Sequence, residues 1–284
     1  MTARLYYNAL HTHPARNSIG LLLKDGAPAG SFDAGARPGF VTVPVANLAT
    51  SEWHTYEILL PYADSVEFRG LIVNEGAAFA AVPPRPVIRY VAYGDSITQG
   101  YWASVPTSNY PARVGDARGW QVQNMGFGGR QATASDGTAV GSLKGAVVTI
   151  LMGVNDSIAG KTPAQFEADY TNLIRNIRAQ QPETPIYAIT PLYTTAPYGG
   201  GALIPQYRAV ISNIVASAGD PNLRLVDGLS LGIDAGNWAA LMPDGIHPND
   251  AGFALVAANL GPRLSFQIVR PPRGLVFAVG QAGP

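Results

Sequence analysis

The sequence predicts two parts: a small β-sandwich of the jelly-roll type, followed by a three-layer α/β domain built on a parallel sheet. Short strand-like runs without a helical pattern fill the first 80 residues, and strand and helix patterns alternate after residue 87. Three prolines in four residues separate the two regions and predict a stiff connection. The expected parts are an accessory domain over 1–82, a linker over 83–86, an α/β domain over 87–263 and a tail over 264–284.

The composition allows two folded domains and excludes several function classes. The chain has 284 residues, of which 47% are hydrophobic and only 13% are charged, so it has ample material for buried cores. Basic and acidic residues number 19 each, and a neutral chain without a basic run lacks the charge that nucleic-acid binding requires. No apolar run reaches the length of a membrane span, so no membrane partner is expected. The absence of cysteine excludes disulfides, thiolate zinc sites and thiol nucleophiles.

The first half contains five strand-like runs, which clusters of Gly, Pro, Asp and Asn separate. Short strands at this spacing are typical of a β-sandwich or jelly roll. The runs cover residues 4–10, 18–23, 40–45, 55–61 and 65–73.

The second half alternates between strand and helix patterns, which indicates a parallel sheet with helices on both faces. Its longest helix is amphipathic and begins with a capping box, in which Thr162 is the N-cap, Pro163 the first helical residue and Gln165 the third. Asn249 caps the last helix. The expected strands are 87–93, 120–125, 146–152, 185–190 and 223–227, and the expected helices are 162–180, 205–218 and 250–260.

The two ends of the chain support weaker expectations. The N-terminal segment MTARLYYNALHTHPARN lacks the basic and apolar regions of a signal peptide, so a cytoplasmic location is expected for the chain as written. The compartment stays open, because a signal peptide could have been removed and secreted bacterial proteins often lack cysteine too. The tail is strand-like over 264–279, and it packs either on the β-sandwich or on another subunit. An apolar tail and a low charge fraction leave room for an oligomer without specifying a number of subunits.

Four loops that follow predicted strands or precede the last helix carry the chemistry-bearing residues. They read YGDSITQG at 93–100, NMGFGGR at 124–130, MGVND at 152–156 and DGIHP at 244–248. Functional groups in α/β sheets lie at the carboxyl ends of the strands. We therefore expect the four loops to meet at one edge of the sheet.

These loops supply what acyl transfer needs. A serine hydroxyl such as that of Ser96 is a weak nucleophile until a base takes its proton. His247 is the only imidazole in the second half, and Asp244, three residues earlier, is placed to hold its tautomer and stabilise the imidazolium. The side-chain amide of Asn155 and the backbone N–H groups of Gly129 and Ser96 are suitable donors for the oxyanion of a tetrahedral intermediate.

In this order, the four blocks resemble those of the GDSL/SGNH hydrolase family: GDSITQG, N-x-G-x-G-G, G-x-N-D and D-x-x-H-P. The resemblance implies an SGNH-type domain with Ser96 as nucleophile and with Asp244 and His247 completing a triad. It also implies that Gly129, Asn155 and the Ser96 amide form the oxyanion hole.

Three glycines, Gly126, Gly128 and Gly129, crowd the second block, so its donor could be assigned one residue off. Gly129 is preferred because the family glycine usually follows a small residue and precedes a polar one.

The function implied by this resemblance is that of a serine esterase. It would hydrolyse short-chain, acetyl-like esters through an acyl-serine intermediate, without a metal or an organic cofactor. A β domain ahead of an SGNH domain is similar in layout to two-domain carbohydrate esterases, which suggests a small-molecule or carbohydrate ester as substrate. The residues expected to shape the substrate pocket are Gln99, Tyr101, Trp102 and Arg130.

Two alternatives remain for the function as a whole. An acyltransferase would use an identical triad and pass the acyl group to an alcohol. A carbohydrate-binding protein with an inactive hydrolase half would belong to a different class, and the presence of every triad and oxyanion residue argues against it.

Three individual motifs also have less specific interpretations. Asp95 could simply cap the helix that follows it. Ser230 lies in a G-x-S-x-G sequence that resembles a nucleophile elbow, but the segment after it is a poor helix start. His11, His13 and His54 could form a metal site, although surface positions are the simpler interpretation.

Overall fold

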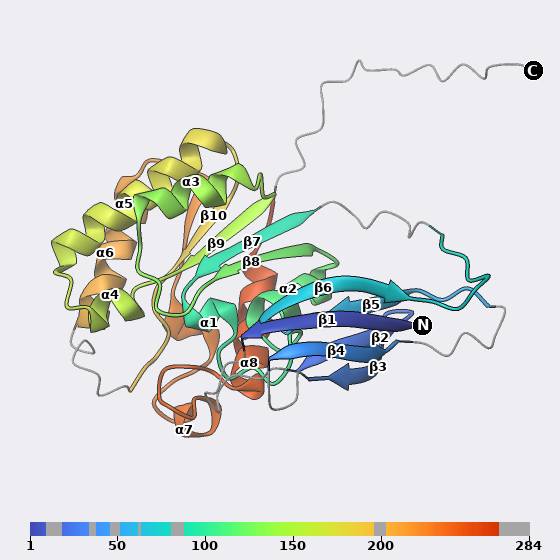
Figure 1. Cartoon of the computed structure of the whole chain (residues 1–284). Coiled ribbons are helices and arrows are strands. Elements are labelled where there is room, and N and C mark those ends of the chain that lie inside the picture. Colours follow the sequence, from blue (N-terminus) through green and yellow to red (C-terminus); the bar gives the residue numbers. More distant parts are fainter. Residues whose placement is uncertain are drawn as a thin grey trace, which may run out of the picture.

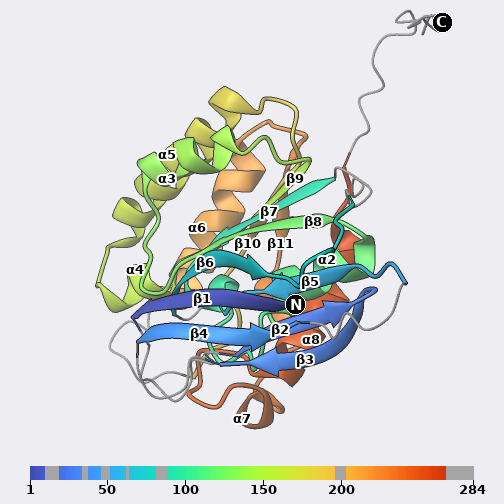
Figure 2. The same cartoon turned by 45° about the vertical axis from the view of Figure 1, so that its right-hand side comes forward.

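A computed structural model describes residues 1–9, 19–33, 38–45, 52–61, 64–80, 88–195 and 203–266. It confirms the predicted architecture: a β-sandwich precedes an α/β domain with a parallel sheet. The views in Figures 1 and 2 agree in placing the sandwich beside helices α2 (Tyr110–Arg118) and α8 (Asp250–Leu260). Among the described residues, no helix combines the length and apolar character that a membrane crossing requires.

The sandwich consists of two three-stranded antiparallel sheets that enclose a small core. Leu5 and Tyr7 of the central strand are completely buried, as the alternation along that strand requires, and Leu22 contributes from the opposite sheet. One sheet has the order β4 (Gly39–Pro44), β1 (Thr2–Ala9), β6 (Ser65–Ile72), and the other has the order β3 (Ala27–Phe32), β2 (Gly20–Lys24), β5 (Tyr56–Leu59). The sequence did not predict β3.

The α/β domain is built on a five-stranded parallel sheet whose first strand, β7, lies inside the sheet. The chain passes from β7 to β8 on one side and then returns to β9 on the other, which creates a topological switch point next to β7. Ligand sites in open α/β sheets lie at such points. The sheet order is β11 (Leu223–Val226), β10 (Ile186–Ile189), β9 (Val147–Leu151), β7 (Arg89–Gly94), β8 (Gln121–Gly126).

Helices cover both faces of this sheet, as predicted. Helices α3 (Ala134–Ser142), α5 (Pro163–Gln180) and α6 (Ile204–Ser217) share one apolar core with the sheet, whereas α2 and α8 share the other (Figures 1 and 2). The capping box at the start of α5 is present. The short helices are α1 (Ser96–Gln99), α4 (Val154–Ile158) and α7 (Trp238–Leu241). Helices α2 and α3 were not predicted from the sequence.

The predicted linker over 83–86 lies outside the described residues, and so does the tail beyond Phe266. The first residues of the tail pack on the α/β domain. The ring of Phe266 lies 5.6 Å from that of Trp120, and Ser265 N donates a hydrogen bond to the Tyr187 hydroxyl at 2.8 Å. For the rest of the tail, packing on the β-sandwich or on another subunit stays a prediction.

Candidate active site

Ser96 is the first residue of α1, directly after strand β7. Asp95 caps this short helix, and its carboxylate accepts a hydrogen bond from Ile97 N at 2.9 Å. The end of the neighbouring strand β8 packs closely on α1, because a Cβ on Gly126 would lie 2.0 Å from Gln99 N. Only glycine allows this approach, which brings the second loop against the helix that carries Ser96.

Ser96, His247 and Asp244 form a chain of hydrogen bonds. Ser96 Oγ lies 2.7 Å from His247 Nε2, and His247 Nδ1 lies 2.7 Å from Asp244 Oδ2. The three side chains come from the loops after β7 and before α8, which are 151 residues apart at the serine–histidine contact. The distances are those at which an imidazole takes a proton from a hydroxyl while a carboxylate holds its other nitrogen.

Asp244 is surrounded by donors that favour its ionised form. Its Oδ1 accepts the backbone N–H groups of Ile246 at 3.0 Å and His247 at 2.8 Å. Partial burial works to raise the pKa of Asp244, but the hydrogen bond and charge of His247 and the two backbone N–H groups outweigh it and hold the pKa well below its usual range. Asp244 therefore remains an anion that can stabilise an imidazolium.

Tyr101 and Trp102, which follow α1, contact this pair directly. The Tyr101 ring lies 4.4 Å from the His247 ring, and Trp102 Nε1 donates a hydrogen bond to Asp244 Oδ2 at 3.0 Å. Trp102 has a left-handed φ of 72°, a conformation that costs free energy in a non-glycine residue and is common at functional sites. The sequence predicted that both residues lie beside the site. In the structure, Tyr101 packs on His247 and Trp102 binds Asp244.

Asn155 lies in the first turn of α4, after strand β9. Its amide nitrogen Nδ2 is buried and has no hydrogen-bond partner among the described residues. A buried amide without a partner is costly, and functional sites are where such groups occur. This nitrogen is therefore a candidate donor to a ligand oxygen.

The glycines of the second loop differ in what their amides contact. Gly126 N donates to Asn124 Oδ1 at 2.8 Å and Gly128 N donates to Gln99 Oε1 at 2.9 Å, so the protein itself uses both groups. Gly129 is exposed and has a φ of 79°, and a Cβ there would meet nothing within 4 Å. Of the three glycines, Gly129 is the one whose surroundings leave room for a ligand.

The remaining two pocket residues from the sequence, Gln99 and Arg130, both hold the second loop. Gln99 binds the Gly128 amide, and Arg130 Nη1 donates to Met125 O at 2.9 Å. The Arg130 guanidinium also lies over the ring of Phe127, at 5.5 Å from its centroid. A groove of about 490 Å³ opens beside this loop, and Ser96, Asn155 and His247 are not part of its lining. The groove is lined by Phe127, Gly128, Gly129, Arg130, Gln131, Thr133, Asp136 and Lys161.

The GDSL-like lipase/acylhydrolase family model matches residues 92–255, which is more than half of the chain and includes all four loops. The chain belongs to this family.

Solved structures are similar to this family member over nearly its whole length. The salicylyl-acyltransferase SsfX3 from a tetracycline biosynthetic pathway has a TM-score of 0.73 at 20% identity, covering 91% of this chain and 77% of that chain. A family two carbohydrate esterase from Clostridium thermocellum has a TM-score of 0.69 at 19% identity, covering 92% of this chain and 87% of that chain. A family two carbohydrate esterase from Cellvibrio japonicus has a TM-score of 0.69 at 18% identity, covering 92% of this chain and 84% of that chain. At these identities the likeness is one of fold. No curated protein sequence matches the chain.

Ser230 and His54 do not form a second site of this kind within the part of the chain that the structure describes. Ser230 lies in a 3-10 helix (Gly228–Leu231), where its hydroxyl donates to Asp227 O at 2.6 Å and contacts Arg263 Nη1 at 2.5 Å. Among the described residues, Ser230 has no imidazole partner and no α-helix directly follows it, although a nucleophile elbow needs both. His54 Nδ1 lies 2.8 Å from Asp25 Oδ2, whereas His11 and His13 lie outside the described residues. In the described part of the chain, no cluster of metal-ligating side chains is present.

Asp95 has an unusual environment for a capping residue. Its side chain is only 1% exposed, and the charge of the nearby His247 acts to lower its pKa. Burial raises the pKa of Asp95 to about 6, against the opposing effects of the Ile97 N–H and of His247.

Replacement of Asp95 by asparagine is expected to change how stability depends on pH. Because burial raises the pKa in the folded state, the folded protein binds more protons than the unfolded chain, and the free energy of unfolding falls as pH rises from about 4 to about 6. A shift from 3.8 to about 6 corresponds to about 3 kcal/mol. Urea unfolding of both proteins across this window should show a steeper loss in the wild type, and equal slopes would contradict the assignment.

Proposed function

We propose that this chain is a serine esterase that hydrolyses short-chain acyl esters through an acyl-serine intermediate. The observation that carries the proposal is the pair of 2.7 Å contacts that join Ser96 Oγ to His247 Nε2 and His247 Nδ1 to Asp244 Oδ2. A nucleophile, a base and a group that orients the base are the minimum for this chemistry.

In the proposed reaction, His247 Nε2 takes the proton of Ser96 Oγ as the oxygen attacks the carbonyl carbon of the ester. The imidazolium then gives this proton to the departing alcohol, and the acyl group stays on Ser96. A water molecule, deprotonated by His247, attacks the acyl-serine, and the imidazolium gives the proton to Ser96 Oγ as the acid is released. Asp244 remains ionised throughout, in agreement with the donors around it, and stabilises the positive ring in both steps.

The negative charge that develops on the carbonyl oxygen needs donors that are in place before the reaction. The proposed set is Asn155 Nδ2, the Gly129 amide and the Ser96 amide. The unpartnered, buried state of Asn155 Nδ2 supports this role, because an oxyanion would provide the missing acceptor.

The groove beside Gly129 supports a small acyl group and a polar alcohol. Burial of a long acyl chain needs an enclosed apolar tunnel, whereas this groove is open and its lining includes Arg130, Asp136 and Lys161. Its one large apolar residue, Phe127, is 61% exposed and offers a flat ring. The charged residues of the lining have partners in the protein, since Arg130 lies 3.8 Å from Asp136 and Lys161 pairs with Asp156 and Asp169, so the lining does not demand a charged ligand. An acetylated sugar has this combination of a small acyl group, a flat apolar face and many hydroxyls.

The proposal predicts that kcat/KM falls with acyl chain length. p-Nitrophenyl acetate, butyrate and octanoate should be hydrolysed in that order of decreasing kcat/KM, and acetylated oligosaccharides should release acetate. Octanoate as the best substrate would overturn the short-acyl preference. Product analysis with an added alcohol distinguishes transfer from hydrolysis, since a transferase would form a new ester.

A further inference from the structure

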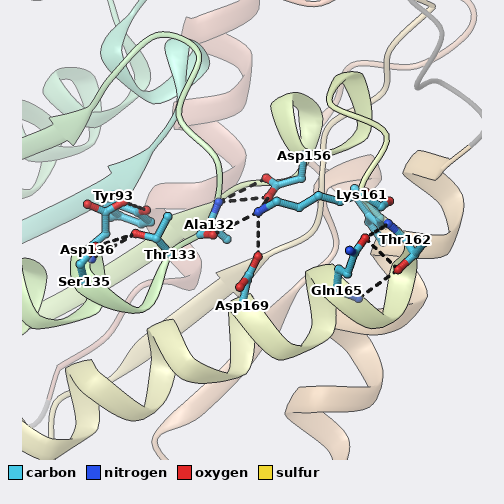
Figure 3. A network of polar contacts seen from close by, with 11 residues as sticks. Tyr93, Ala132, Thr133, Ser135, Asp136, Asp156, Lys161, Thr162, Gln165 and Asp169 are labelled. Carbon is cyan, nitrogen blue, oxygen red and sulfur yellow. Dashed lines mark hydrogen bonds and ion pairs between the residues drawn. The ribbon is translucent and has the colours of Figure 1, made fainter.

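A buried carboxylate directly follows Asn155 in the chain. Asp156 is 0% exposed, and its two oxygens accept a hydrogen bond from Ala132 N at 3.1 and 3.4 Å (Figure 3). Ala132 belongs to the loop that contains Gly129, three residues earlier. Asp156 therefore joins the loop of one proposed oxyanion donor to the helix of the other.

Lys161 is the cation that compensates this carboxylate. Its Nζ lies 2.9 Å from Asp156 Oδ1 and 2.7 Å from Asp169 Oδ2, and it donates a weaker bond of 3.4 Å to Ala132 O. Figure 3 shows the ammonium group between the helix that carries Asp156, the helix that carries Asp169 and the Ala132 loop. One side chain thus contacts three segments of the chain.

The backbone of Lys161 is also held at both of its polar groups. Its N–H donates to Asp156 O at 3.1 Å, and its carbonyl accepts the Tyr207 hydroxyl at 2.6 Å. The lysine side chain is 20% exposed, so the ion pair with the buried Asp156 is shielded from solvent. A shielded pair with several hydrogen bonds holds its geometry better than a surface ion pair.

Burial raises the pKa of Asp156, although the hydrogen bond and charge of Lys161 and the Ala132 N–H act in the opposite direction. Loss of the lysine would leave this carboxylate without its cation in a buried position. Such a carboxylate must take up a proton or move toward water, and either change disturbs its contact with Ala132.

We propose that Lys161 is a positioning residue of the oxyanion hole. It holds Asp156 on the Ala132 amide and so sets the distance between the Gly129 amide and the Asn155 amide. The proposal rests on the function proposed above. Oxyanion donors act through their placement, and a displacement of about 1 Å can cost about 10²-fold in rate.

A double-mutant cycle with Asn155 tests this role. Lys161→Met should lower kcat for p-nitrophenyl acetate by about 10- to 100-fold and leave KM nearly unchanged, because only transition-state contacts are lost. In an Asn155→Ala background, the same Lys161→Met change should cost much less, since the donor that it places is already absent. Equal effects in both backgrounds would overturn the positioning role, and so would an effect confined to KM.

Control variants separate this role from general destabilisation. Lys144→Met removes an exposed lysine whose Nζ binds Gln180 O at 2.7 Å, and it should leave kcat unchanged. If Lys161→Met does not fold, Asp156→Asn serves in the same cycle, because it removes the charge and keeps an oxygen near Ala132 N. Lys161→Arg, which retains the cation, should recover part of the lost kcat.

The failure of the positioning role can be distinguished from the failure of the proposed function. If Asn155→Ala lowers kcat as expected but the Lys161 effect is additive, only the positioning role is wrong. If Asn155→Ala has full activity, the oxyanion hole itself is wrong, and the role of Lys161 is overturned with it.

Discussion

Replacement of Ser96 by alanine is expected to lower kcat for ester hydrolysis by on the order of 10⁴-fold or more. In the proposed reaction this hydroxyl forms the covalent intermediate, and its removal leaves His247 without the proton that it takes. Binding and oxyanion contacts remain, so a small residual rate above that of water is expected. Hydrolysis of p-nitrophenyl acetate by the two proteins, side by side, measures the loss.

The fold should tolerate this change. Ser96 is partly buried, and its side chain makes one hydrogen bond, to His247, so its removal should cost about 1 kcal/mol of stability. Ser230→Ala is the matched control, because its hydroxyl also makes short hydrogen bonds but lies in the decoy motif, and it should retain full activity. Labelling by a fluorophosphonate should vanish in Ser96→Ala alone. Retained turnover in Ser96→Ala would remove the central assignment.

The parts of the site that the sequence predicted are those that parallel-sheet geometry brings together. The blocks around Ser96, Gly129 and Asn155 each follow a strand, and the carboxyl ends of parallel strands meet at one edge. Local signals were also reliable. The capping box of Thr162 and Gln165 involves residues three apart, so its formation depends little on the rest of the fold.

The helices that the sequence missed depend on tertiary contacts. Helix α3 has the sequence ASDGTAVGS, in which glycine and small polar residues argue against a helix. In the structure, a Cβ on Gly137 would lie 2.3 Å from Leu173 O of α5. Gly137 therefore lies where two helices pack closely together. The sequence of α3 alone does not reveal the partner helix that makes a glycine favourable at this position.

The supporting contacts of the site were beyond sequence reasoning for a similar reason. Trp102 and Asp244 are 142 residues apart, and the hydrogen bond between them depends on how two loops meet. Lys161 directly precedes a helix cap, where a charged residue is ordinarily a solvated one, and one of its partners is a backbone carbonyl. Backbone groups carry no sequence signal, so the network around Asp156 is visible only in three dimensions.

The second large effect is expected for His247→Ala, which should lower kcat/KM by several orders of magnitude. In the proposed reaction, His247 Nε2 accepts the proton of Ser96 Oγ, which it contacts directly. The same nitrogen then protonates the leaving alcohol. Its removal also leaves Asp244 without the imidazole that it holds, although Trp102 Nε1 can still donate to Asp244 Oδ2.

His54→Ala is the matched control for this variant. His54 also pairs with an aspartate, since its Nδ1 lies 2.8 Å from Asp25 Oδ2, but it belongs to the β-sandwich, and its described contacts are with Asp25, Glu52 and Tyr56. Full activity of His54→Ala beside an inactive, folded His247→Ala would assign the base to one imidazole. A loss of less than about 10-fold in His247→Ala would place the base elsewhere, because a triad without its histidine cannot sustain such a rate. The buried carboxylate of Asp95, with its pKa of about 6, would then be the group to replace next.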